Sequence, residues 1–355
     1  MAYHYTALPK DSNSYSGDYN YPTLGVAMRY TMSNVTMHRE KDSDWGLLEP
    51  VNYHSKLGSI ASVYGFFYRP IYRTKHWDFA YQLNFGVAYA LKKYDKLTNA
   101  DNEFIGSHLL IYFGSALKAT YYLDDKWGIR AGLDFFHHSN GALNRPNKGA
   151  NYFGPTLGLV YSPERKAILN HSKDTIQNRF KPYFYTQFTF GLGGKTLNEE
   201  WQRTQFGTQP TDPEYRIGNF KFYTAYSFRS DLMYRYAQRW ASGLGVDVFY
   251  GTYANRVREL DQSHGIAMKH SRWSVGIAAK HQVFYNNLSL SVALGYYLYR
   301  AMGENASIIE KPYYEHVGIY YTFNKLKNLT LGAQVKAHAT KADLTEFILA
   351  IPIKI

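Results

Sequence analysis

A His and a Ser stand two residues apart in the stretch "DFFHHSNGALNRPNKGANYF", residues 134–153. Residues i and i+2 of an extended strand share one face, so the side chains of His137 and Ser139 are expected to point the same way. An imidazole beside a hydroxyl is the arrangement in which a general base activates a serine nucleophile. An ordinary polar strand end has the same residue types, so the spacing alone indicates either a hydrolytic site or a solvated rim.

Composition limits the class of protein. The chain has 355 residues with 35 Tyr, 21 Phe and 6 Trp, no Cys, and a mean hydropathy of −0.42. The lack of Cys excludes disulfide scaffolds and thiolate metal sites, and no apolar run approaches the roughly 18 residues that a membrane helix needs. The first residues lack the features of a secretory signal, as expected either of a cytosolic protein or of one whose signal has been removed.

The formal net charge of +12 indicates an anionic partner, either nucleic acid or a phosphorylated lipid. The Lys and Arg residues are scattered through connecting segments without a nucleic-acid motif, so we expect no nucleic-acid partner. The 13 His show no metal-ligand spacing. The segment "GLGGKT" at 191–196 ends like a phosphate-binding loop, but Thr189 stands where that motif requires its first Gly. We therefore expect neither a metal nor another cofactor.

Long stretches alternate between apolar residues and polar or small ones. Segment 77–90 carries an aromatic and aliphatic row on one face, and segments 288–299 and 328–340 behave in the same way. This period of two predicts strands longer than the ~5–6 residues usual in soluble sheets. A soluble sandwich also alternates, but here Gly, Ala and Ser crowd the polar face, and Tyr and Trp bracket the apolar face as at a bilayer interface. The pattern predicts an all-β, transmembrane antiparallel up-and-down β-barrel.

Fourteen strands are expected, an even number that allows an antiparallel barrel to close without a free edge. They centre on 23–33, 57–70, 77–90, 106–122, 127–139, 151–162, 182–193, 218–233, 240–252, 270–284, 288–300, 312–323, 328–340 and 343–355. Tight turns such as "DDKW" and "KLKN" alternate with longer loops, which places the tight turns and both termini in the periplasm. The longer loops are 34–56, 91–105, 194–217 and 253–269, with segment 163–181 and the link near Lys341 as exceptions. We expect residues 1–22 to be a polar lead-in and residues 23–355 to form one barrel domain.

The expected strand 127–139 places the His–Ser pair at the outer rim of this barrel. Its lipid-facing row fills residues 127–135, about the ~9–11 residues that cross the bilayer. His137 and Ser139 follow in the same row. The lipid-facing row of the returning strand, 151–162, extrapolates back to Asn151. We therefore expect His137, Ser139 and Asn151 to meet on one exterior patch at the outer leaflet.

The segment "HHSNGALNRPNKG" resembles the active-site segment of the lipid A 3-O-deacylase (PagL-like acyloxyacyl hydrolase) family, outer-membrane barrels that remove an acyl chain from lipopolysaccharide. That family shows His, any residue and Ser-Asn, followed by Pro-Asn, any residue and Gly. The corresponding residues here are His137, Ser139, Asn140, Pro146, Asn147 and Gly149. The resemblance is confined to residues 134–153. It implies Ser139 as nucleophile, His137 as general base, and an oxyanion hole around the loop that follows Asn140, with Asn147 a contributor.

One position departs from the family pattern. The family carries a Glu two residues after the Gly, where it orients the His, and this chain has Asn151 there. An Asn can hold the imidazole in the correct tautomer, but it lacks the charge that stabilises the imidazolium, and a carboxylate-to-Asn exchange in a serine triad costs about 10⁴ in rate. Glu103 shares the odd-numbered register of the neighbouring strand near the same rim, which makes it a candidate surrogate acid.

These features together predict a bacterial outer-membrane esterase that hydrolyses an ester-linked acyl chain of lipid A, with outer-leaflet lipopolysaccharide as its substrate. The alternative is a non-catalytic barrel: a subunit of a larger outer-membrane assembly, or a channel. A channel would bind its solute in the lumen, whereas an assembly subunit would co-purify with outer-membrane protein partners. Which ester of lipid A is cleaved stays open at this point.

Overall fold

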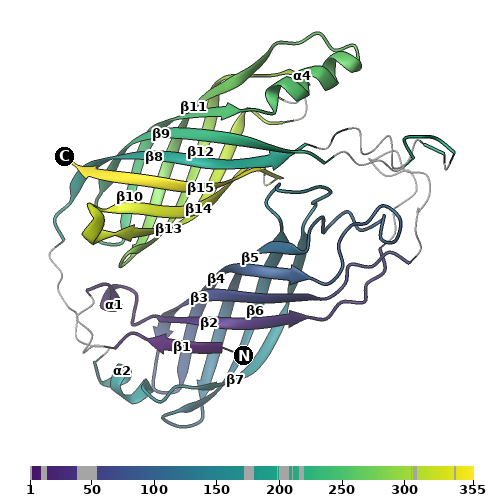
Figure 1. The fold of residues 1–355 in the computed structure, drawn as a ribbon. Coiled ribbons are helices and arrows are strands. Elements are labelled where there is room, and N and C mark those ends of the chain that lie inside the picture. Colours follow the sequence, from purple (N-terminus) through teal and green to yellow (C-terminus); the bar gives the residue numbers. More distant parts are fainter. Residues whose placement is uncertain are drawn as a thin grey trace. The chain divides into compact units, whose positions relative to one another are not determined.

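Two separate antiparallel sheets make up the protein (Figure 1). The computed structural model describes residues 2–8, 14–37, 54–171, 180–197, 199, 208–209, 211–215, 220–304, 306, 310–339 and 341–355. Their Cα positions cluster into two compact units. Unit 1 comprises residues 1–140, 146–178 and 202–217, and unit 2 comprises residues 141–145, 179–201 and 218–355.

Unit 1 contains a seven-stranded sheet in which the strands follow one another in sequence order. They are β1 (Ala2–Thr6), β2 (Thr23–Thr31), β3 (Ile60–Arg73), β4 (Trp77–Ala90), β5 (Leu109–Tyr122), β6 (Trp127–Ser139) and β7 (Ala150–Tyr161). Two short helices, α1 (Tyr15–Asp18) and α2 (Arg165–His171), lie outside the sheet. Ile168 of α2 packs with Leu8 and Tyr21, which ties the chain after β7 to the segments that flank α1.

Unit 2 contains a closed barrel of eight strands. They are β8 (Tyr183–Thr196), β9 (Phe222–Arg235), β10 (Trp240–Gly251), β11 (His270–Tyr285), β12 (Leu288–Met302), β13 (Tyr313–Phe323), β14 (Leu329–His338) and β15 (Lys341–Lys354). The barrel closes because β15 pairs with β8, with Phe347 opposite Leu192. Helix α4 (Ala254–Ser263) precedes β11, and the 3-10 helix η2 (Asn324–Leu326) links β13 to β14. No helix in the described part of the chain is long and apolar enough to cross a membrane.

The expected all-β, antiparallel up-and-down architecture is confirmed, but the closure differs from the one expected. A single barrel of fourteen strands would pair β7 with β8, whereas β8 pairs with β9 and β15. Residues 23–355 therefore do not share one sheet, and residues 2–6 of the expected lead-in form β1 beside β2. Alternation specifies which face of a strand is apolar, and any antiparallel neighbour satisfies that requirement equally well, so the pattern could not identify the closing partner.

Short and long connections alternate as expected from β2 to β7 and from β8 to β14, but the connection 7–22 before β2 is long and the link 339–340 before β15 is short. In unit 1 the turns 74–76 and 123–126 are short, whereas β2–β3, β4–β5 and β6–β7 are joined by longer segments. We call the end of each sheet that carries the longer connections its loop end. Residues 38–53 of the predicted loop 34–56, half of the predicted loop 194–217, and residues 172–179 of the predicted segment 163–181 lie outside the described residues.

The strands of both units expose their apolar rows and bury their polar or small ones. In β4 the side chains of Phe79, Leu83 and Phe85 are exposed, while those of Asp78 and Asn84 are buried. An apolar exposed face and a polar interior are the pattern of a lipid-facing barrel. The predicted orientation of the strand rows is therefore the observed one.

Hydrogen bonds between side chains of different strands cross the interior of the barrel in unit 2. Arg229 of β9 donates to Gln334 of β14 and to Glu346 of β15, both at 2.6 Å. Tyr314 of β13 donates to Asp247 of β10 at 2.8 Å, and Asp247 also accepts from the Lys280 ammonium at 2.7 Å. The four charged side chains in these bonds, Arg229, Glu346, Asp247 and Lys280, thus each have a partner of opposite charge, as low-dielectric interiors require.

Candidate active site

Strand pairing brings His137 and Asn151 directly opposite each other. Both lie near the loop end of unit 1, on the adjacent strands β6 and β7. Further down the same rows the large apolar side chains of Leu133 and Leu157 are exposed, so the pair belongs to the exposed face of the sheet. His137 and Asn151 were predicted to lie next to each other on the exterior, and they do so in the structure.

A hydrogen bond of 2.7 Å joins His137 Nδ1 to Asn151 Oδ1. An amide oxygen can only accept, so the imidazole donates from Nδ1. A neutral imidazole with its proton on Nδ1 keeps a lone pair on Nε2. Asn151 therefore holds His137 in the tautomer with a free lone pair on Nε2, which is the tautomer that a general base acting through Nε2 would need.

Gly149 closes the other side of the imidazole. Its φ of +74° lies in the left-handed region, which favours glycine. A Cβ at this position would lie 2.5 Å from His137 Cε1 and 3.1 Å from Nε2. Any side chain there would displace the ring, so both the backbone angle and the space require the Gly of the "PNKG" segment.

Ser139 is the last residue of β6 and lies on the same face as His137. Its strand partner is Ile111 of β5, just as Phe113 is the partner of His137. Among the described residues, no hydrogen bond joins the Ser139 hydroxyl to the imidazole. The structure thus brings His137 and Asn151 into contact and places Ser139 one step along the same row. Catalytic hydrogen bonds are often long in the free enzyme and shorten when substrate binds.

The two other asparagines of the predicted site meet in the loop after β6. The backbone N–H of Asn140 donates to Asn147 Oδ1 at 3.1 Å, and Asn140 itself is buried. The side-chain N–H₂ of Asn147 makes no hydrogen bond with the described residues, so it keeps donors for another oxygen. This is what an oxyanion-hole contributor requires.

Glu103 lies beside this loop, where its carboxylate pairs with Lys148. The distance from Lys148 Nζ to Glu103 Oε2 is 2.5 Å, and the carboxylate side chain is only 5% exposed. Glu103 is the predicted surrogate acid, whereas the pattern of the sequence predicts no role for Lys148. Lys148 stands at a loop position where a Lys is unremarkable, so only the tertiary contact singles it out.

On the buried face of β6, His138 bonds to a residue that sequence analysis did not connect with it. Its Nε2 lies 2.9 Å from the hydroxyl oxygen of Ser62 on β3, and both side chains are buried. Deeper in the same row, Asp134 pairs with Arg29 at 2.7 Å and with Lys118. Asp134 is thus neutralised by two cations on other strands of the same unit, and only the strand register reveals these partners.

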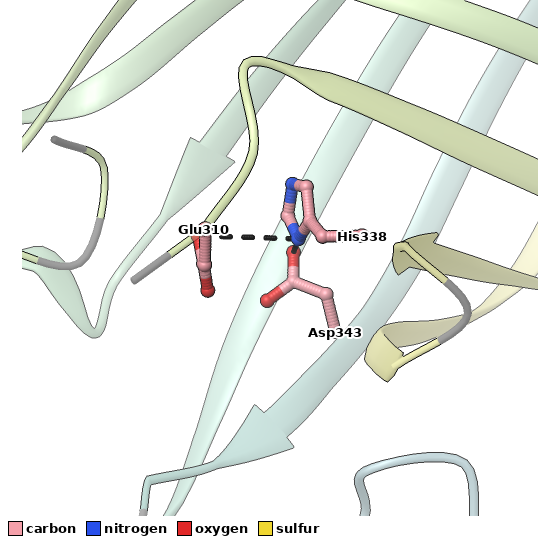
Figure 2. A group of neighbouring side chains, drawn as sticks. All are labelled: Glu310, His338 and Asp343. Atoms are coloured by element: carbon pink, nitrogen blue, oxygen red, sulfur yellow. Dashed lines mark ion pairs between the residues drawn. The ribbon is translucent and has the colours of Figure 1, made fainter. Parts of the chain in front are cut away.

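Unit 2 contains a triad with the atoms of a metal site, Glu310, His338 and Asp343 (Figure 2). His338 Nδ1 lies 3.9 Å from the carboxylate of Glu310 and 3.8 Å from that of Asp343. However, Arg300 donates to His338 Nε2 at 2.6 Å, which leaves the proton of the neutral ring on Nδ1, the atom that would have to bind the metal.

Cations also surround the two carboxylates of this triad. Lys336 lies 2.8 Å from Asp343, Lys195 pairs with the same carboxylate, and Arg300 pairs with Glu310. Two negative charges therefore face three positive ones before any ion is added. The residues fit an internal ion-pair network and do not fit a divalent cation. Lys195 belongs to the "GLGGKT" segment, and its ammonium is used here.

Comparison with known proteins matches the two sheets to two family models. Residues 19–160 match the model described as lipid A 3-O-deacylase (PagL), and residues 183–354 match the model described as acyloxyacyl hydrolase, C-terminal domain. The first range contains β2 to β7 almost entirely, and the second contains the closed barrel. No curated protein shows a significant match to the chain.

Three outer-membrane structures illustrate the likeness to solved proteins. An outer-membrane channel from Pseudomonas putida F1 is 11% identical, with 94% of this chain and 95% of that chain covered and a TM-score of 0.21. A BenF-like porin from Pseudomonas fluorescens Pf-5 is 10% identical, with coverages of 93% and 99% and a TM-score of 0.22. The KdgM porin is 6% identical, with coverages of 83% and 93% and a TM-score of 0.18. These TM-scores are low, and no feature of this chain is inferred from them.

The family matches account for both sheets, and the first of them includes the paired His137 and Asn151 together with Ser139. Members of this family are outer-membrane hydrolases that act on lipid A. The chain is an outer-membrane protein that belongs to the lipid A 3-O-deacylase family.

Proposed function

We propose that this protein hydrolyses an ester-linked acyl chain of lipid A at the patch formed by His137, Ser139 and Asn151. The observation that carries the proposal is the 2.7 Å hydrogen bond from His137 Nδ1 to Asn151 Oδ1 on the exposed face of the sheet. A core histidine would be buried, and its ring nitrogens would form hydrogen bonds with other buried groups. This one is held by a neighbour on the lipid-facing side, with Nε2 left as a base.

The chemistry follows from that tautomer. Ser139 Oγ attacks the ester carbonyl while its proton passes to His137 Nε2. The oxygen of the tetrahedral intermediate carries the negative charge, and we assign the N–H₂ of Asn147 as the side-chain donor that binds it. Collapse of the intermediate breaks the ester C–O bond and expels the alkoxide of the lipid A hydroxyl, which takes the proton from His137. A water molecule then attacks the acyl-serine by the same route, and the fatty acid leaves.

Asn151 sets the efficiency of this site. In the protonated state of His137, a carboxylate partner would stabilise the imidazolium, whereas a neutral amide oxygen stabilises it only through its dipole. The expected activity is therefore lower than that of a site with a carboxylate at this position, by up to about 10⁴. The reaction still proceeds, because nucleophile, base and oxyanion donor remain.

The membrane environment fits an anionic lipid as substrate. The site lies at the loop end of strands whose exposed rows are apolar, so an acyl chain can approach it from the bilayer. The net charge of +12 favours a lipid that carries phosphate groups. Lipid A of the outer leaflet has both features.

A channel is the less favoured alternative. The bonds from Arg229 to Gln334 and from Tyr314 to Asp247 cross the barrel of unit 2 and leave charged side chains paired within it. A solute pathway needs water-exposed groups along the lumen, and these groups are buried. A non-catalytic role in a larger outer-membrane assembly makes a different prediction, which is that Ser139→Ala has no effect on lipid A.

Mass spectrometry of lipid A tests the proposal. Lipid A is compared from cells that lack the protein, carry it, or carry the Ser139→Ala variant at equal outer-membrane abundance. A species that has lost one ester-linked acyl chain is expected with the natural protein alone. Identical lipid A in all three strains would refute the proposal and favour the assembly role, whose protein partners would then be sought by co-purification.

A further inference from the structure

Two short segments from different loops are joined beside the site. The backbone N–H of Lys148 donates to the carbonyl of Glu103 at 3.0 Å, and the N–H of Gly149 donates to the carbonyl of Phe104 at 3.0 Å. The Lys148 ammonium also pairs with the Glu103 carboxylate at 2.5 Å. Main-chain and side-chain bonds thus connect the same two stretches of chain.

The segment that carries Glu103 is firmly anchored. Asn102 is fully buried, its side-chain N–H₂ donates to the carbonyl of Lys56, and its Oδ1 accepts from the N–H of Ile105. Asn99 donates to the same Lys56 carbonyl and to that of Lys93. Ile105 belongs to the buried apolar cluster of unit 1. Glu103 therefore presents its carboxylate from a fixed support.

The segment that carries Lys148 contacts the catalytic base. Gly149 fits so closely against the imidazole of His137 that a Cβ would lie 2.5 Å from Cε1. On the other side of Lys148, Asn147 accepts the hydrogen bond from the N–H of Asn140. Lys148 lies between the residue that closes the imidazole edge and the residue proposed to bind the oxyanion. A shift of this segment would move both.

We infer that Glu103 and Lys148 form a latch that positions the loop 146–149 against His137, and that Glu103 is a positioning residue rather than the acid of the site. This inference rests on the proposed function for its catalytic consequence. The Glu103 carboxylate is already neutralised by Lys148, and the Nδ1 that an acid would bind is already occupied by Asn151. The Glu103 side chain is buried and that of Lys148 is 38% exposed, and the ion pair favours the loop position shown because a buried carboxylate without its cation is strongly unfavourable.

Hydrogen exchange and kinetics of matched variants test the latch. The variants are Glu103→Gln, Lys148→Met, both together, and the exchanged pair Glu103→Lys with Lys148→Glu. Lys126→Met, at an exposed turn residue, is the control. Exchange of the backbone amides of residues 145–150 is followed by mass spectrometry. In parallel, kcat, KM and the pH profile of lipid A hydrolysis are measured.

Each single variant is expected to exchange faster in residues 145–150 and to lower kcat by about 10- to 100-fold, because small displacements of catalytic groups have effects of that size. The double variant should be no worse than the single ones, and the exchanged pair should recover slow exchange and most of kcat. The acid limb of the pH profile should stay in place, because His137 and Asn151 are unchanged.

Three results would overturn the inference. Exchange in residues 145–150 that is unchanged in both single variants would show that the pair does not hold the loop. Losses that add in the double variant would show that the two residues act separately. A large loss and a shifted pH profile in Glu103→Gln with near-normal Lys148→Met would make Glu103 the acid. The exchange result does not depend on turnover, so an inactive natural protein with the expected exchange pattern would refute the proposed function and leave the latch standing.

Discussion

His137 and Asn151 face each other across β6 and β7, and the imidazole donates from Nδ1 to the Asn151 amide oxygen at 2.7 Å. This one bond selects the tautomer of the proposed base and leaves it without a negative partner. Replacement of Asn151 by Glu should therefore raise kcat for lipid A deacylation, because a carboxylate stabilises the imidazolium formed as Ser139 attacks. The gain should be at least about tenfold and is measured by release of fatty acid from purified lipid A. Asn151→Ala, which removes the acceptor, should lower kcat, and equal rates in all three proteins would exclude a role for this contact.

Ser139 is expected to carry the acyl group during turnover. Ser139→Ala should abolish deacylation while the folded protein keeps its heat-resistant migration on gels, because Ser139 is the last residue of β6 and its side chain is only partly buried. The measurement is lipid A mass spectrometry combined with gel mobility before and after heating. Undiminished deacylation by this variant would end the assignment of the site.

Leu133 tests the lipid-facing side of β6. Its side chain is 49% exposed near the middle of the strand, so Leu133→Arg should cost about 2–4 kcal/mol of unfolding free energy in a bilayer. The neighbouring Gly132 faces the interior, where an added Cβ would lie 2.5 Å from Lys118 Cδ, so Gly132→Ala should act through a steric clash. Urea unfolding in lipid vesicles and in detergent separates the two, since the cost of Leu133→Arg depends on the bilayer and that of Gly132→Ala does not. An Arg variant as stable as the natural protein in vesicles would contradict this orientation.

The two sheets should respond separately to loss of a buried charge. Arg229 pairs with Glu346 at 2.6 Å inside the barrel of unit 2, and both side chains are buried. Arg229→Met leaves the carboxylate unpaired and should destabilise that barrel by about 3–5 kcal/mol. Protease protection followed by mass spectrometry should show earlier cleavage in residues 220–355 while residues 60–161 stay protected. Parallel loss of protection in both regions would mean that the sheets unfold as one.

Single cysteines test which end of the strands faces the cell exterior. The natural chain has no Cys, so each introduced thiol is the only one to react. Cysteines at Thr98 and Glu259, in loop-end connections, should react with an impermeant reagent on whole cells. Those at Asp125 and Lys325, in tight turns, should react only after the outer membrane is opened. The reverse pattern would place His137 at the inner leaflet, away from lipopolysaccharide.

Much of the fold follows from alternation in the sequence. A period of two that lasts for ten or more residues identifies long strands and their apolar faces, and the tight turns mark one end of the sheet. Which strand closes the barrel does not follow, because β8 could satisfy its apolar row beside β7 as well as beside β15. The pairing of Phe347 with Leu192 that closes unit 2 is a contact between distant parts of the chain, and no local pattern specifies it.

For the candidate site too, some features follow from the sequence and others depend on the tertiary structure. The spacing of His137 and Ser139 along one strand places both on a shared face, and the return of β7 brings Asn151 opposite His137, so the strand positions of these three follow from the sequence. The partners of Glu103 and His138 were decided by tertiary structure, because Lys148 and Ser62 reach them from other loops and strands. Side-chain direction on a strand is a local property of the backbone, whereas ion pairs and lumenal bonds depend on the register of strands that are far apart in sequence.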